Sequence, residues 1–270
     1  MESIEIETAA QSLERSVVFH VVKEMVGFVL YMHQQIPAIL QDLSHEYDTL
    51  QEELKSLDLV RTQTNVKASS QRKHIGNMRE VKQGIKKLGK LMNSIFSLQT
   101  AIQLMLNEIP DIHEIILILG ASPLRPKYVY EMCFSCGKSF QGSVNDFSKS
   151  KTAETLSRKV IRSLISKGAG SSTYAGPMKL FLLVKAPSTF SLPLHFLPKR
   201  DYRYSKKISP FRLCIRCRTH DQDMDASHND PVASQTASYT SIPDSTGNNL
   251  IWFQCKHTIK GLASRTPLEE

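Results

Sequence analysis

The sequence has no hydrophobic run long enough to cross a membrane. No apolar stretch approaches the roughly 18 residues that a membrane span needs. The first residues, MESIEIETA, are acidic and lack the basic-then-apolar order of a signal peptide. We therefore expect an intracellular protein with reduced thiols, and an odd total of 5 cysteines agrees with that expectation.

Recognisable catalytic arrangements are also missing. The sequence contains no nucleophile elbow, no paired-carboxylate motif and no zincin helix. The glycines between Gly168 and Gly176 suggest a phosphate-binding loop, but that motif ends in Gly-Lys-Ser/Thr, and Gly176 is followed by Pro177. Gly137-Lys138-Ser139 also fails, because Met132 stands where the motif needs its first glycine. We therefore expect a protein that is not an enzyme.

The charge balance is moderately basic. The 270 residues include 34 Lys and Arg against 26 Asp and Glu, a net charge of +8. Such a charge suits an acidic partner or nucleic acid, and it equally suits a solvated basic face. Part of it gathers around Tyr202 and Tyr204, whose rings are able to stack on bases. The cluster comprises Lys199, Arg200, Arg203, Lys206, Lys207, Arg212, Arg216 and Arg218. We favour a charged sheet edge that blocks strand addition over nucleic-acid binding.

Apolar residues at three- and four-residue spacing predict three helices in the first part of the chain. They span 9–35, 38–57 and 72–107, and the polar, aperiodic stretch 58–72 between the last two is expected to be a mobile loop. The third helix has a stripe spacing near 3.5, which allows a coiled coil. We favour close packing onto a sheet instead, because Gly84 and Gly89 permit a close approach.

A hairpin is predicted to follow at the centre of the sheet. The run Ile115–Leu119 is short and rich in β-branched residues, typical of a strand buried on both faces. Gly120–Pro126 turns the chain. Alternation from Tyr128 to Cys133 then predicts a half-exposed strand.

The rest of the chain is predicted to contain one helix and four strands. Thr152 can cap a helix over 153–167, which Gly168 ends. The strands are expected at 180–184, 202–205, 211–217 and 250–253, the last with the sole tryptophan. Residues 218–248 are polar and expected to be a disordered insertion. We thus expect one domain over 1–262, followed by a tail at 263–270.

Two Cys-x-x-Cys pairs form the sharpest chemical pattern. Cys133 with Cys136, and Cys214 with Cys217, can supply four thiolates to a tetrahedral zinc ion. The alternative is reduced structural cysteines in a β core, as we expect for Cys255. Zinc together with the basic cluster would make the chain a zinc-stabilised nucleic-acid-binding protein.

Four short blocks, in order along the chain, resemble the Comet family. They are YMHQQIP (31–37), EIILILGASPLRPKYVY (114–130), HFLPKRDYR (195–203) and IWFQCKHTIKG (251–261). The resemblance implies an α+β, HORMA-like fold. Three helices would pack on a mostly antiparallel sheet, and a C-terminal segment would wrap as a safety belt.

The same resemblance implies a function and a location. Comet-like proteins are non-enzymatic adaptors that bind the closed conformer of Mad-two. They present it to the hexameric pachytene-checkpoint AAA+ ATPase, and remodelling of the HORMA protein silences the spindle checkpoint. A meiotic HORMA relative is an alternative client. The resemblance implies no required cofactor, no membrane or nucleic-acid partner, and a place in nucleus and cytoplasm, at the kinetochore or spindle of dividing cells.

Some site residues carry over from this resemblance. Pro198 and Lys199 match the Pro-Lys pair that engages the ATPase. The residues matched to HORMA-partner binding are Met32, Thr155, Arg158, Lys159 and Arg162. This sequence departs from the pattern in having Met32 in place of glutamine, and Gly168–Gly170 in place of a phenylalanine. The Cys-x-x-Cys pairs are not a family feature, but the implied sheet would make 128–133 and 211–217 neighbours and bring the four thiols together.

Overall fold

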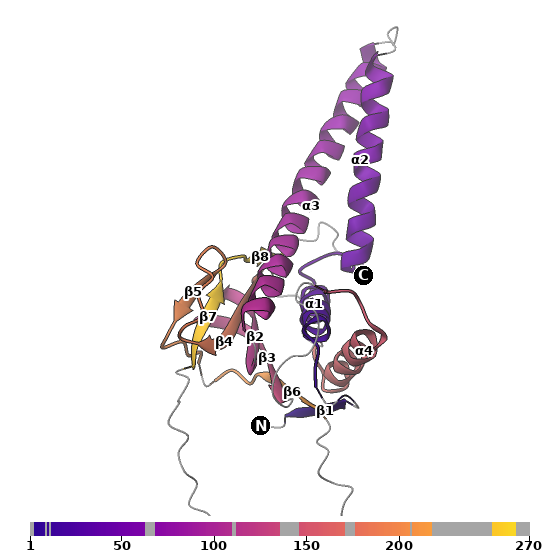
Figure 1. Cartoon of the computed structure of the whole chain (residues 1–270). Coiled ribbons are helices and arrows are strands. Elements are labelled where there is room, and N and C mark those ends of the chain that lie inside the picture. The colour runs from indigo at the N-terminus through magenta and orange to yellow at the C-terminus, as the bar shows by residue number, and fades with distance from the viewer. Residues whose placement is uncertain are drawn as a thin grey trace, which may run out of the picture.

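The computed structural model has an α+β fold of helices around a mixed sheet (Figure 1). It describes residues 3–8, 10, 12–62, 68–109, 112–135, 146–170, 176–205, 207–217 and 250–262. The helices are α1 (Arg15–Met32), α2 (Leu40–Thr62), α3 (Ala68–Glu108) and α4 (Lys151–Ser166). The strands are β1 (Ile4–Thr8), β2 (Glu114–Ser122), β3 (Arg125–Ser135), β4 (Lys179–Pro187), β5 (Phe196–Lys199), β6 (Phe211–Cys217), β7 (Leu250–Cys255) and β8 (Ile259–Lys260).

The predicted hairpin lies at the centre of the sheet. The strand order is β1-β6-β3-β2-β4-β7-β5, with β8 paired to β4. The pairs β2–β3, β2–β4, β4–β7, β4–β8 and β5–β7 are antiparallel, whereas β6 runs parallel to both β3 and β1. The sheet is therefore mixed. Its parallel edge was missed in part because we did not predict β1, a strand of only five residues.

Alternate side chains divide the sheet between two apolar clusters. The larger cluster lies on the helix side and includes Ile115, Leu117, Tyr130 and Met132. The smaller cluster lies on the opposite, outer face. Its buried members are Ile116, Ile118, Val129, Phe181, Leu183 and Tyr202. Strand β3 is therefore buried on both faces, and our prediction of a half-exposed strand is wrong.

The outer face is covered by the chain that follows β5. Residues 202–205 are not a strand, contrary to our prediction. Their alternating tyrosines pack down onto the sheet instead of pairing with it: Tyr202 donates a hydrogen bond to the Pro123 carbonyl at 3.1 Å, and Tyr204 donates one to the Glu131 carboxylate. An alternating pattern indicates a segment with one buried face. Here the segment is extended and lies over the sheet without pairing with a strand.

Helices α2 and α3 form a hairpin that projects from the rest of the molecule (Figure 1). Gly84 lies against Leu50, and Gly89 lies against Tyr47, so both glycines face α2 and not a sheet as we expected. The buried residues Met78 and Val81 belong to neither apolar cluster. The coiled-coil alternative therefore describes the outer half of α3 better than sheet packing does.

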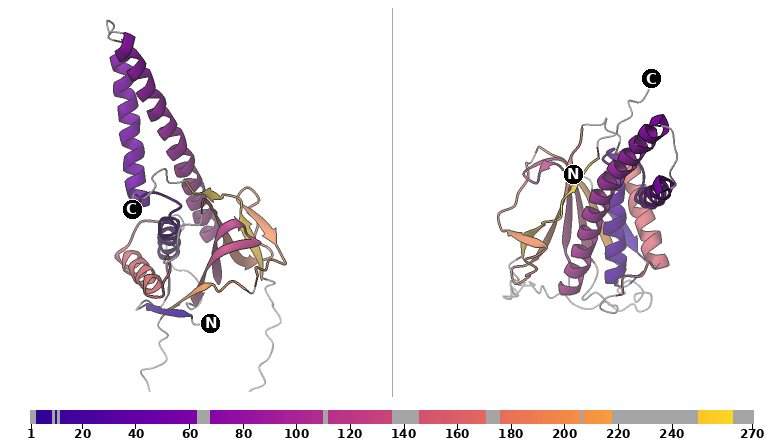
Figure 2. Two further views of the ribbon diagram at one scale, coloured as in Figure 1. Left: turned by 180° about the vertical axis from the view of Figure 1, so that it is seen from behind. Right: turned by 90° about the horizontal axis from the view of Figure 1, so that it is seen from above.

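The helices that cover the sheet are α1 and the C-terminal half of α3, with α4 against α1 (Figure 2). The expected mobile loop at 58–72 is wrong at both ends, because α2 continues to Thr62 and α3 begins at Ala68; residues 63–67 lie outside the described part. Helix α1 begins at Arg15 and not near residue 9. The insertion predicted at 218–248 and the tail at 263–270 also lie outside the described residues.

Helix α4 is capped two residues earlier than predicted. Ser150, not Thr152, is its N-cap, and the Ser150 hydroxyl accepts a hydrogen bond from the Ala153 amide at 3.2 Å. Gly168 follows the helix with φ +78°, a conformation that favours glycine, as expected of a residue that ends a helix. Among the described helices, none has the length and apolar character of a membrane span.

Candidate functional site

The outer face of α4 is exposed, as the docking surface predicted from the resemblance requires. Thr155, Arg158 and Arg162 are exposed, and Arg158 pairs with Glu154 one turn earlier. Ile165, which was not predicted as a site residue, continues this stripe and is 52% exposed. The apolar pattern of this helix predicts an inward-facing Ile165, and that prediction is wrong, because Ile165 lies one turn from Arg162 on the exposed side.

Lys159 has a structural partner as well. Its ammonium donates a hydrogen bond to the Glu7 carbonyl at 2.8 Å, which ties α4 to the edge strand β1. A partner protein that binds here would therefore contact a lysine whose ammonium already donates a hydrogen bond to a backbone carbonyl. Within the predicted set, Lys159 positions the helix, whereas Arg158 and Arg162 project from it.

Met32 lies at the end of α1, against the chain that leaves α4. Gly170 adopts φ +85°, and a Cβ on it would lie 2.6 Å from Met32 Cε and 2.8 Å from Met32 Cβ. The two departures from the family pattern thus meet in space. The glycine leaves room for the methionine, and Met32 is partly covered by this contact.

Gln35 joins the end of α1 to the C-terminal segment. It is fully buried, and its amide donates to the carbonyls of His33 and Gly176 and accepts from the Met178 amide at 2.6 Å. The Leu262 amide donates to the Gln35 carbonyl at 2.7 Å. The last described residues are therefore fixed to the first helix, which sequence reasoning missed.

Pro198 and Lys199 are exposed on β5, an edge strand of the sheet. They pair with Phe253 and Trp252 of β7. Two exposed leucines precede this pair in the sequence: Leu194 is 81% exposed and Leu197 is 44% exposed. Exposed apolar patches rimmed by polar residues mark interaction sites, and this surface, β5 with residues 194–199, lies on the opposite side of the molecule from α4 (Figure 2).

The cysteines are brought together only in part. Cys133 of β3 and Cys214 of β6 are register partners on neighbouring strands, as the implied sheet predicts. Both are free thiols, and burial and the Glu114 carboxylate raise the pKa of Cys133 to about 12. Cys217 is disulfide-bonded, so the expectation of reduced thiols is wrong for this residue, and Cys136 lies outside the described residues. The described residues contain no group of three or more potential ligands at metal-binding distance, and a four-thiolate zinc site would require reduction of Cys217.

The basic cluster is partly used inside the fold. Arg212 pairs with the buried carboxylate of Glu131, and Arg216 pairs with Glu5 at 2.8 Å. Lys206 and Arg218 lie outside the described residues. Two arginines of the cluster, Arg212 and Arg216, therefore neutralise acids of the sheet.

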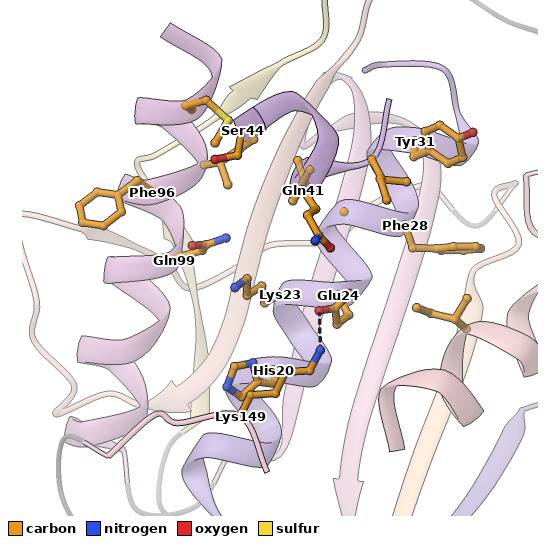
Figure 3. Close-up of a pocket in the computed structure, with 16 residues that line it drawn as sticks. His20, Lys23, Glu24, Phe28, Tyr31, Gln41, Ser44, Phe96, Gln99 and Lys149 are labelled. Carbon is orange, nitrogen blue, oxygen red and sulfur yellow. Dashed lines mark ion pairs between the residues drawn. The ribbon is translucent and has the colours of Figure 1, made fainter. Parts of the chain in front are cut away.

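A groove over α1 was not predicted. It lies between α1, α3, α4 and the start of α2, has a volume of about 660 Å³, and is lined by Phe28, Tyr31 and Phe96 (Figure 3). Its polar end carries the ion pair between Lys149 and Glu24 at 4.0 Å. His20 lies at the same end, buried, with Nε2 bonded to the Phe147 carbonyl at 3.0 Å. Burial lowers the pKa of His20, against the raising effect of its hydrogen bond to the Phe147 carbonyl.

No protein-family model matches the chain, and no curated protein matches it in sequence.

Proposed function

We propose that this protein is a non-enzymatic adaptor that binds the closed conformer of a HORMA protein, Mad-two or a meiotic relative. In this proposal it presents that client to the pachytene-checkpoint AAA+ ATPase and so silences the spindle checkpoint. The fold would be HORMA-like, with the C-terminal segment as its safety belt. The proposal starts from the four resembling blocks and gains support from where they lie in the fold.

The observation that carries the proposal is the closure of the C-terminal segment, residues 250–262. Strand β7 inserts between β4 and β5, β8 pairs with β4, and Leu262 reaches the end of α1. Trp252 is thereby held on the sheet beside Lys185, whose ammonium lies 5.6 Å from the centroid of the indole ring. A chain closed in this way offers α4 and β5 as fixed surfaces, and fixed surfaces bind without an ordering cost.

The test is complex formation with a HORMA protein locked in its closed state. We expect the two proteins to co-migrate in size-exclusion chromatography, through an interface of ordinary size, about 1,600 Å² in total. Arg162→Glu reverses a charge at the centre of the exposed α4 stripe and should abolish co-migration. Arg79→Glu makes the same change on the projecting hairpin and should leave the complex intact.

Two results would contradict the proposal. Absence of a complex with the unmodified protein would remove the adaptor function. Equal loss in both variants would mean that net charge, and not the α4 surface, determines binding. Circular dichroism of both variants should match the unmodified protein, because both arginines are exposed.

A further inference from the structure

One transverse row of side chains crosses the outer face of the sheet. Direct register partners on successive strands place seven residues in line: Lys199, Trp252, Lys185, Glu114, Cys133, Cys214 and Glu5. Their neighbours along each strand face the helix-side cluster, as Met132 and Leu213 do. The two cysteines are thus adjacent, on the same face, and on neighbouring strands.

Adjacent positions on paired strands lie about 4.8 Å apart in backbone. The Cys214 thiol is one of the groups that raise the pKa of Cys133, which agrees with their direct pairing on neighbouring strands. Both residues are half-buried, so solvent reaches the pair while the sheet fixes its geometry.

Two ion pairs flank the thiols. Cys133 has the Glu114 carboxylate beside it on β2, and Cys214 has Glu5 beside it on β1. Each carboxylate is paired with a cation, Glu114 with Lys185 at 3.5 Å and Glu5 with Arg216 at 2.8 Å. The described residues offer two sulfur ligands here and no third ligand at metal-binding distance, whereas zinc prefers four.

We propose that Cys133 and Cys214 form a two-thiolate site for a soft monovalent ion of the Cu(I) class. Thiolate sulfur selects such ions. Binding replaces two S–H protons by one Cu(I): two thiols and Cu(I) give a linear bis-thiolate complex of charge −1 and release two protons, with no change of oxidation state. Lys185, a member of the row, and Arg216 supply positive charge beside the site, through their contacts with Glu114 and Glu5. This site is independent of the proposed adaptor function.

The experiment is a competition for Cu(I) between the full chain and a chromophoric Cu(I) chelator, without oxygen. We expect the unmodified protein to retain about one ion per chain, and X-ray absorption to show two sulfur neighbours. Cys133→Ser and Cys214→Ser should each lose this retention. Cys255→Ser, at a buried free thiol, and the double variant Cys136→Ser with Cys217→Ser should both keep it.

Three outcomes would overturn the site. Retention by Cys133→Ser or Cys214→Ser would show that the ion lies elsewhere. Loss in the double variant, or a spectrum with four sulfur neighbours, would assign the metal to the four-thiolate arrangement. Near-ultraviolet circular dichroism around Trp252 controls for folding, and Cys214→Ala serves as a second variant if the serine disturbs the strand.

Discussion

His33 illustrates how a single buried side chain sets a property of the whole chain. It lies under Tyr128, with ring centroids 3.9 Å apart, and Nε2 is hydrogen-bonded to the Tyr130 hydroxyl at 2.7 Å. Burial lowers the pKa of His33 from 6.5 to about 4, and Lys127 acts in the same direction. The folded protein therefore holds this imidazole neutral at a pH where the unfolded chain protonates it.

Stability should consequently fall in mild acid. Between pH 6.5 and about 4 the unfolded chain binds more protons at this site, so the free energy of unfolding decreases as pH falls. The full contribution is roughly 3 kcal/mol. His33→Gln should be less stable at neutral pH, because it loses the stacked ring, and the difference from the unmodified protein should shrink towards pH 4.

Urea unfolding across this pH range measures the effect. His20 and His257 also have lowered pKa values, chiefly through burial, but they are present in both proteins and cancel in the comparison. Two parallel pH profiles would show that His33 is not the group responsible.

Gly261 is needed because Gln35 fills the space beside it. A Cβ at this glycine would collide with the Gln35 amide oxygen and lie 3.1 Å from Gln35 Cβ. Gly261→Ala should displace Gln35 and break its bond from the Met178 amide, at a cost of about 2–3 kcal/mol in unfolding free energy. Chemical denaturation measures the loss.

Gly76→Ala is the matched control. Gly76 is exposed within α3, and a Cβ there would meet nothing within 4 Å. This substitution should raise stability by up to about 1 kcal/mol, because alanine is the better helix former. A stabilising effect of both substitutions would mean that the Gln35 contact is loose.

Sequence patterns predicted which side chains are buried far better than which ones meet. The pairing of Met32 with Gly170, and of Gln35 with Gly261, joins positions more than a hundred residues apart, and no local period records such a contact. The strands that carry Cys133 and Cys214 were expected to be neighbours only from the implied fold, and the register of the two cysteines was not predicted. Side-chain partners across the fold depend on register, which a single sequence specifies weakly.

At the scale of elements, the helical hairpin separates into an inner and an outer part. The outer part packs through Met78 and Val81, which belong to neither cluster of the body, whereas Leu88 and Leu91 join the large cluster. Excision of residues 51–83, with a short glycine–serine link, should therefore leave the body folded. Helical circular dichroism should decrease, while Trp252 fluorescence should not change.

Leu88→Ala in the full chain is the contrast to this excision. Leu88 is 5% exposed and lies in the large cluster, so its truncation should cost about 2–5 kcal/mol. An excised protein that loses Trp252 burial, or unfolds at lower denaturant than Leu88→Ala, would show that the outer hairpin supports the body.

The strongly periodic elements were predicted well, and the short or covered ones were not. Strand β6 matches the predicted range 211–217, and β2, β3, β4 and β7 were placed correctly within a few residues. Strand β1 was missed because IEIET is too short to show a clear alternation. Residues 202–205 were mistaken for a strand because their alternating tyrosines pack on the outer face of the sheet. The helix end at 57 was placed too early and the helix start at 72 too late, because polar residues also continue a helix that projects into solvent.

At the scale of the whole molecule, the two proposed surfaces are far apart but share one support. The α4 stripe lies on one side of the fold, and β5 lies on the other (Figure 1). Among the described strands β5 pairs with β7 alone, and β7 belongs to the C-terminal segment that closes on α1. An adaptor that holds a client with one surface and engages a motor with the other needs such a separation, so that both partners bind at once.

Charge reversal at Lys199 should therefore separate the two proposed activities. Lys199→Glu changes an exposed residue on β5 without touching α4, so the HORMA complex should persist in size-exclusion chromatography while stimulation of the ATPase is lost. Lys86→Glu, an equal charge change on the hairpin, should preserve both activities. Loss of client binding in Lys199→Glu would place the client on the β5 surface and reverse the assignment of the two faces.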